Sequence, residues 1–262
     1  MTTAVITTQQ IYDLIGVYLW PFCRIGSLFM VMALIGTKMI PVRTRLVFAL
    51  SITVAVAPML PEAQSFELIS PQAYIVVLQQ LIIGAVIGIL SHVILQSFVL
   101  GGQILAMQSG LGFAQMMDPT SGVTVPIVSQ FFLMTASLIF LSLDGHVYML
   151  QMIIHSFHTL PVGTWGVEPE NYFELVLFAK WMFASALMMA MAAVAALLLI
   201  NISFGITTKA APQLNIFAIG FPVTIMAGLL IAWVSLGQML PRFLQHWEAG
   251  RQMMCQLLNM SC

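Results

Sequence analysis

Histidine is a frequent metal ligand, and three of the five histidines of this chain, His146, His155 and His158, lie within one short stretch. Only His155 and His158 have the three-residue spacing that places two side chains on one helix face. No Glu or Cys accompanies them as in the zinc-binding His-Glu-x-x-His pattern. The sequence also lacks a Ser-His-Asp pattern and a nucleophile elbow. We therefore expect a protein that is not an enzyme and has no metal site or cofactor.

The three cysteines, Cys23, Cys255 and Cys262, are odd in number, and Cys23 lies far from the other two. They match no disulfide framework and no zinc-ligand spacing. Cys23 lies in an apolar run, where a free cysteine behaves as a small hydrophobic side chain.

Two basic residues stand inside apolar stretches, Arg24 near the N-terminus and Lys180 in the second half of the chain. A charge at the centre of a bilayer costs about 3 kcal/mol on insertion scales, so each should face protein, water or a headgroup. Arg24 could belong to a polar site in the interior of an assembly. It could also be paired within its own helical bundle, or reach a membrane surface.

A polar stripe is predicted where His92, Gln96 and Gln103 fall on one helix face. The stripe could line a channel, or it could hydrogen-bond to neighbouring helices. Both interpretations make these residues candidate buried polar groups.

The overall composition identifies the helices that must position these residues. Of 262 residues, 60% are hydrophobic and only 6% are charged, against about 25% charged in soluble domains. The net charge of −1 argues against a nucleic-acid partner, which requires clustered Lys and Arg. The chain is therefore expected to be an all-α, polytopic membrane protein.

Uncharged stretches longer than the roughly 20 residues of a membrane-crossing helix separate the few charges. Apolar segments lie at 14–36, 46–60, 72–100, 127–158, 172–202 and 214–240. The Gly101-Gly102 pair predicts a kink or break in the long third stretch, and Asp144-Gly145 predicts a turn that divides the fourth. Six crossings would place the loops with Lys38–Arg45, Asp118 and Lys209 in the cytoplasm and both termini outside.

The first informative loop runs from Gly110 to Gly122, directly after the longest uncharged stretch. Gly110 and Gly112 permit unusual backbone conformations, and Asp118-Pro119 ends any helix at or before Asp118. The loop also contains three large apolar residues, Phe113, Met116 and Met117. Because Met is flexible, such a loop could block an aqueous pore and then rearrange. It could equally be an ordinary connection whose apolar side chains pack on the bundle.

The second loop covers residues 207–222, with one positive charge, Lys209, before a turn broken by Pro212. The apolar helix that follows is predicted to be interrupted at Gly220 and Pro222. In lipid, broken backbone persists only where protein or water satisfies its polar groups, so this loop should lie against other protein.

Several motifs resemble the FliR family, the R-type subunit of the flagellar type III export gate. The most specific is Lys-Ala-Ala-Pro-Gln-Leu-Asn-Ile-Phe over 209–217, followed by Gly-Phe-Pro over 220–222. Gly-Phe-Ala-Gln-Met-Met-Asp-Pro over 112–119, Trp20-Pro21, Ile40-Pro41 and His-Thr-Leu-Pro over 158–161 also resemble that family. The resemblance covers about 12–245 of a single subunit, 1–262, and leaves 246–262 as a C-terminal tail.

The resemblance implies a subunit of kinked helical hairpins, similar to a P-like plus a Q-like subunit fused, in a helical export-gate assembly. Its implied partners are P-type, Q-type and FlhB-type subunits, other flagellar export-apparatus proteins and unfolded export substrates. The implied location is the bacterial inner membrane at the flagellar basal body. Residues 110–122 would be the channel plug, formed by Gly110, Gly112, Phe113, Met116, Met117, Asp118 and Pro119. The signature loop would support assembly through Lys209, Pro212, Gln213, Asn215, Phe217, Gly220 and Pro222.

Two other classes of protein remain as alternatives. A secondary transporter with discontinuous helices would bind a small solute near Gly-Pro breaks. It predicts internal repeats, and none is convincing in this sequence. An intramembrane enzyme would need the nucleophile or metal cluster that the sequence lacks.

Overall fold

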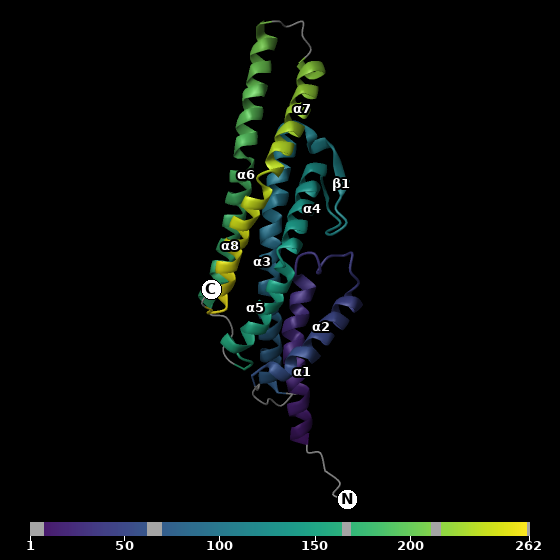
Figure 1. Ribbon diagram of the computed structural model, residues 1–262, viewed down its shortest axis with the longest axis vertical. Coiled ribbons are helices and arrows are strands. Elements are labelled where there is room, and N and C mark those ends of the chain that lie inside the picture. The colour runs from purple at the N-terminus through teal and green to yellow at the C-terminus, as the bar shows by residue number, and fades with distance from the viewer. Residues whose placement is uncertain (1–7, 62–69, 164–168, 211–215, 261–262) are drawn as a thin grey trace, which may run out of the picture. The chain divides into compact units, whose positions relative to one another are not determined.

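The computed structural model describes residues 8–61, 70–163, 169–210 and 216–260. Its α-helices are α1 Thr8–Val31, α2 Val42–Val56, α3 Pro71–Ser109, α4 Ile127–Ser142, α5 Gly145–Thr159, α6 Pro169–Ala210, α7 Ile216–Leu236 and α8 Met239–Leu257 (Figure 1). The shorter elements are the 3-10 helices η1 Ala57–Met59 and η2 Leu111–Phe113 and the strands β1 Gln115–Met117 and β2 Thr124–Pro126. The fold is thus nearly all-α, and the strands correct the all-α expectation.

Four described helical stretches are long and apolar enough to cross a membrane, and the pair α4 and α5 would make a fifth. The four are Val42–Met59, Pro71–Ser109, Phe173–Ala210 and Ile219–Leu236. In α1, Ile15–Val31 is apolar but shorter. The long apolar helices expected from the composition are therefore present in the structure. The six-crossing orientation stays a prediction.

The chain forms two compact units, each assembled from separate stretches. The first contains Met1–His92, Asp144–Val176 and Gly250–Cys262. Within it, α1 packs on α2, α5 and η1, and it buries Trp20, Leu28 and Phe29. Burial of these large apolar side chains is the main source of stability in this unit.

The second unit contains Val93–Leu143 and Leu177–Ala249. Its buried aromatic residues include Phe98 and Phe243, whose rings stack with centroids 5.8 Å apart. Because α8 runs continuously from Met239 to Leu257, the predicted C-terminal tail begins inside a helix.

The predicted break at Gly101-Gly102 is wrong, because α3 continues through both residues. A Cβ atom added at Gly102 would lie 2.8 Å from Cα of Ser129 in α4. One added at Gly101 would lie 2.0 Å from the end of Met189 in α6. These glycines therefore let neighbouring helices approach closely, and they do not interrupt their own helix.

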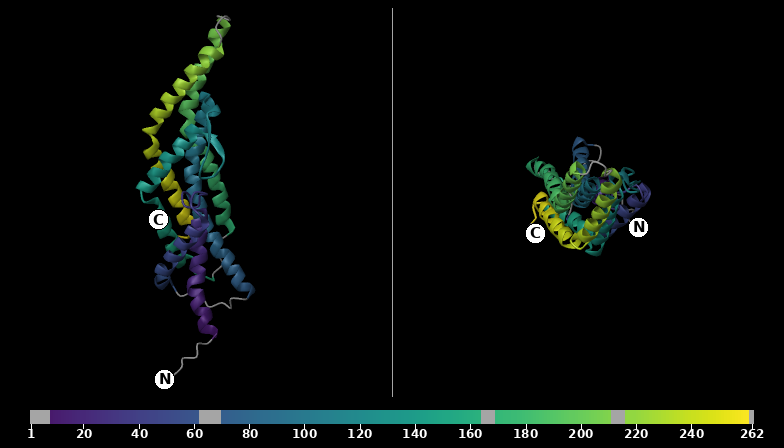
Figure 2. Two further views of the ribbon diagram at one scale, coloured as in Figure 1. Left: turned by 90° about the vertical axis from the view of Figure 1, so that its right-hand side faces the viewer. Right: turned by 90° about the horizontal axis from the view of Figure 1, so that it is seen from above.

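The predicted interruption at Gly220 and Pro222 is also wrong, since the α7 ribbon is unbroken in Figures 1 and 2. Pro222 gives up one backbone hydrogen bond to the carbonyl four residues earlier, which helices of membrane proteins tolerate. By contrast, the turn predicted at Asp144-Gly145 is confirmed. Asp144 adopts a left-handed conformation, φ 54°, between α4 and α5.

Two smaller expectations also change. Arg43 and Arg45, assigned to a loop from the sequence, lie in the first turn of α2. The buried Arg45 guanidinium donates to the carbonyl oxygens of Thr37 and Ile40 and so fixes the preceding turn. Cys255 is disulfide-bonded, contrary to the expectation from cysteine spacing, while Cys23 is free.

Candidate functional site

The first candidate site lies between α3 and α4, where the chain leaves a long helix and returns (Figure 1). Helix α3 ends because Gly110 adopts the left-handed conformation, φ 80°, which glycine reaches without steric cost. A Cβ at Gly110 would lie 3.0 Å from the Phe221 ring, and one at Gly228 would lie 2.2 Å from Cβ of Ser109. Helix α7 therefore packs tightly on the point at which the loop begins.

The loop is an ordered ribbon of two short antiparallel strands. Gln115 is opposite Pro126, Met116 opposite Val125 and Met117 opposite Thr124. The ribbon is closed at its base by the Ile127 amide, which donates to the Ala114 carbonyl at 3.0 Å. We name residues 110–126 the β-ribbon loop. The structure thus replaces the expected flexible loop with a regular element.

Asp118 organises the tip of the β-ribbon loop. Its carboxylate accepts hydrogen bonds from the Thr120 amide at 2.9 Å, the Thr120 hydroxyl at 2.7 Å and the Ser121 hydroxyl at 2.7 Å. The Asp118 amide donates to the Val123 carbonyl at 2.9 Å, and Gly122 follows with φ 76°. Burial raises the pKa of the Asp118 carboxyl, but the hydrogen bonds from Ser121 and Thr120 outweigh it and leave the pKa lowered. Asp118 is therefore charged at neutral pH and caps the turn.

This rigid frame presents large apolar side chains to the outside. Phe113 is 88% exposed, Met117 69% and Met116 41%. An isolated chain gains nothing from exposing apolar groups on a scaffold held by so many hydrogen bonds. The arrangement is suited to contact with another surface or to closing an opening.

Arg24 forms the second notable site, at the centre of the first unit. It is completely buried and donates from Nε to Gln80 Oε1 at 2.7 Å, from Nη1 to the Ser156 carbonyl at 2.9 Å and hydroxyl at 3.0 Å, and from Nη2 to the Leu160 carbonyl at 2.8 Å. Its guanidinium carbon lies 4.1 Å from the Phe157 ring centroid. Arg24 therefore joins α1 to α3 and α5.

The acceptors explain how a buried cation is tolerated. The Ser156 and Leu160 carbonyls lie at the C-terminal end of α5, where the helix dipole is negative. The Ser156 carbonyl also accepts from the Leu160 amide at 2.9 Å, whereas the carbonyl of Leu160, the C-cap residue, has no partner within the helix. Arg24 thus caps α5 from a neighbouring helix. Of the three interpretations from the sequence, pairing within the bundle is the one that this geometry supports.

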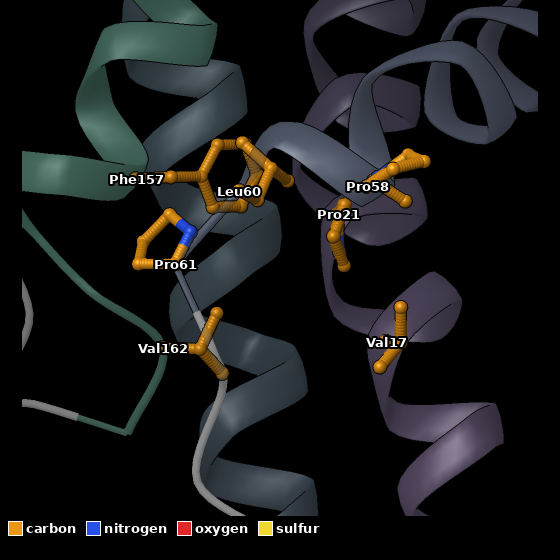
Figure 3. A pocket seen from close by; sticks show the side chains of 8 residues that line it. Val17, Pro21, Pro58, Leu60, Pro61, Phe157 and Val162 are labelled. Atoms are coloured by element: carbon orange, nitrogen blue, oxygen red, sulfur yellow. The ribbon is translucent and has the colours of Figure 1, made fainter.

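An apolar pocket lies beside this network and is shown in Figure 3. It is a cavity of about 220 Å³, with Phe157, Pro61 and Val162 on one side and Val17 and Pro21 of α1 on the other. Its wall offers no charged or polar side chain, so any polar contact to a ligand would come from the backbone.

The other candidate polar residues are less buried than Arg24. Lys180 is exposed on α6, which corrects its assignment as buried. His92 is half-buried and hydrogen-bonds to the Val31 backbone, and Gln96 and Gln103 are also only half-buried on α3. Among the described residues, no group of three or more His, Cys, Asp or Glu could hold a metal ion.

The signature loop is only partly described. Lys209 is exposed in the last turn of α6, Gly220 is buried and Pro222 is exposed in α7. Phe217 lies in the first turn of α7. Pro212, Gln213 and Asn215 lie outside the described residues. Their predicted role in assembly stays a prediction.

Sequence reasoning missed the partners that make these sites work. Asp-Pro-Thr-Ser over 118–121 is a recognisable turn pattern in which an Asp side chain bonds to following amides, and it could have predicted the capped tip. Nothing local to Arg24 pointed to Gln80, Ser156 or Leu160.

Comparison with known proteins identifies a family that covers most of the chain. Residues 15–250 match the family described as Bacterial export proteins, family 1. The flagellar biosynthetic protein FliR of Escherichia coli (strain K12) is 31% identical over 241 residues, 92% of this chain and 92% of that protein. FliR of Pectobacterium carotovorum subsp. carotovorum is 31% identical over 229 residues, 87% of each chain. FliR of Bacillus subtilis (strain 168) is 28% identical over 232 residues, 87% of this chain and 89% of that protein. This chain therefore belongs to family 1 of the bacterial export proteins, together with the flagellar biosynthetic proteins named FliR.

Proposed function

We propose that this chain is the R-type structural and gating subunit of a flagellar type III export gate. The names of its relatives, all flagellar biosynthetic proteins, support a role in the flagellar export apparatus. The four or five apolar stretches support a multi-pass protein of the bacterial inner membrane, at the flagellar basal body. In this role the chain performs no chemistry of its own.

The observation that carries the gating role is the exposed apolar cluster Phe113, Met116 and Met117 on an ordered scaffold. A narrow opening lined by apolar side chains is an unfavourable environment for water and ions. The flexible Met side chain can pack against neighbouring surfaces of different shapes. The Asp118-capped tip and the Gly110 turn hold the cluster in position without burying it. We assign the β-ribbon loop as the channel plug.

Exposed apolar helix faces support a subunit built for partners. Large exposed side chains occur along three helices: Val47 and Phe48 on α2, Phe183, Met188 and Leu199 on α6, and Leu230, Trp233 and Val234 on α7. Lipid covers such faces in a bilayer, and neighbouring subunits cover them in an assembly. We propose P-type, Q-type and FlhB-type subunits as these neighbours. The P-like plus Q-like hairpin organisation belongs to the same proposal.

The transporter alternative has lost the feature that favoured it. It required a discontinuous helix at Gly220 and Pro222, whereas α7 is continuous there. No other described feature forms a polar site for a small solute at that helix.

The plug is tested by replacing Phe113, Met116 and Met117 together with Ser, and separately by deleting residues 112–118. Both variants should assemble with their partner subunits but leak small ions, which is measured as membrane conductance in cells. Met226→Ser, an equally exposed methionine on α7, is the matched control and should not leak. Conductance equal to that of the parent in both assembled variants would exclude the plug role.

A further inference from the structure

A second cavity, of about 250 Å³, lies within the second unit between α6 and α8. It is lined by Trp181, Ser185 and Met188 from α6 and by Arg242, Gln245 and His246 from α8. It is separate from the β-ribbon loop, and neither the family membership nor the plug assigns it a role.

Arg242 gives the cavity a single uncompensated positive charge. Its side chain is half-buried, and its guanidinium has no hydrogen-bond acceptor or carboxylate among the residues that the structure describes. A half-buried cation in the wall of a cavity is available to pair with an anionic ligand.

His246 forms the back wall and is not a second charge. Its Nδ1 lies 2.8 Å from Ser97 Oγ, and its ring packs against Trp181 and Phe98 with centroids 4.8 and 4.9 Å away. Burial and the nearby Arg242 lower the pKa of His246 to about 4. The ring is therefore neutral at physiological pH, and Arg242 alone sets the charge of the site.

The donors in the wall match a phosphate group. The Arg242 fork can bind two oxygens of a phosphate at once, and the exposed Gln245 side chain offers an amide next to it. The Ser185 hydroxyl already donates to the Trp181 carbonyl at 2.7 Å, so its proton is not available to a phosphate oxygen.

The apolar surface beside the cavity favours an amphipathic ligand. Met188, 65% exposed, forms part of the cavity, and with the exposed Met191, one turn further along α6, it forms an apolar stripe. Free phosphate would leave this surface in water, whereas the acyl chains of a lipid would cover it. Trp181 is a residue type that favours the boundary between headgroup and chain.

We propose that this cavity binds the phosphate of an anionic glycerophospholipid through Arg242, with its acyl chains lying along α6. Basic pockets beside membrane helices are suited to such headgroups. Bound lipid would neutralise Arg242 and cover the adjoining apolar stripe.

The test uses the full-length chain purified in neutral detergent and titrated with dioleoyl phosphatidylglycerol, with native mass spectrometry as the readout. We expect one saturable lipid and weaker binding of dioleoyl phosphatidylcholine, which carries no net charge. Arg242→Gln should weaken phosphatidylglycerol binding about tenfold or more, as expected for loss of a charge-assisted pair. Arg242→Lys should retain part of the affinity because it keeps the charge. Lys180→Gln removes an exposed cation beside Trp181 and should bind like the parent.

The melting temperature of each variant without lipid shows whether it is folded. Equal weakening by Lys180→Gln and Arg242→Gln would mean that lipid binds to general surface charge, and it would overturn the site. Competition by glycerol phosphate at the concentration at which the lipid binds would assign a free phosphate and not a lipid. Unchanged lipid binding by Arg242→Gln, together with loss of co-purifying subunits, would show that Arg242 pairs with a partner's carboxylate.

Discussion

Replacing Arg24 by Met tests whether this arginine stabilises the fold or serves the assembled gate. Met keeps the unbranched apolar stem of Arg but ends before the guanidinium, and it has no donors. In the substituted chain, Gln80 Oε1 and the Leu160 carbonyl lose the donor that Arg24 supplies. The Ser156 carbonyl keeps the Leu160 amide as a donor at 2.9 Å. Two buried acceptors are therefore left unsatisfied.

The magnitude follows from these two groups. A buried acceptor without a donor costs about 1–3 kcal/mol, so the pair costs roughly 2–6 kcal/mol. Removing a cation that had to be desolvated offsets part of this. We therefore expect a net loss of about 3 kcal/mol, in the lower half of that range. For a chain of this size, that loss lowers the melting temperature by roughly 6–12 °C.

The assay is thermal unfolding of the full-length chain in detergent, followed by the fraction that stays monodisperse after heating. Arg24→Lys keeps the charge but loses the fork, and it should fall between Met and the parent. Lys180→Met, at an exposed position on α6, is the matched control and should melt within about 1 °C of the parent.

One result would refute this reasoning. If Arg24→Met melts with the parent while motility is lost, the hydrogen bonds of Arg24 do not stabilise the chain. Arg24 would then be a polar site of the assembly interior, the alternative left open by the sequence.

The remaining predictions concern close packing and pH. Gly102→Ala should lower stability by about 2 kcal/mol, because the new Cβ would meet the Ser129 backbone, which cannot move aside as a side chain can. Gly205→Ala, at a helical glycine with no neighbour within 4 Å, should be neutral or stabilising by up to about 1 kcal/mol. Equal melting temperatures of the Gly102→Ala and Gly205→Ala variants would contradict this account. Burial lowers the pKa of His246 to about 4 in the folded chain. As pH falls, His246 is therefore protonated at a higher pH in the unfolded chain than in the folded one, which favours unfolding. The free energy of unfolding should be constant above about pH 6.5 and decline between there and pH 4. The His246→Gln variant should show a flatter decline. An unaltered pH profile in this variant would exclude His246 as the cause.

Local signals in the sequence predicted those features that depend on a few neighbouring residues. The apolar runs marked the long helices, and Asp144-Gly145 marked the turn between α4 and α5. The Gly-rich stretch and Asp118-Pro119 placed the end of α3 before Asp118, and it lies at Ser109. Each of these depends on the backbone preference of a residue or on hydropathy over one helix length. Such properties act before any tertiary contact forms.

Tertiary packing decided how the same residue types were used. Gly101 and Gly102 look like a helix break, but they permit close contact with Met189 and Ser129 in other helices. Lys180 and Arg24 both interrupt apolar runs, yet one is exposed and the other is buried.

The sequence by itself determined that this chain is a multi-helix membrane protein with no evident catalytic motif, and its motifs identified the family. It did not determine where Arg24 finds its acceptors, because these lie 56 to 136 residues away along the chain. Nor did it determine that the loop after Gly110 is a ribbon fixed by Asp118. A buried cation is stable only when residues distant in the sequence supply its acceptors, whereas the exposed Met116 and Met117 are held by strand pairing and by the turn at Asp118. Local hydropathy contains no information about those contacts.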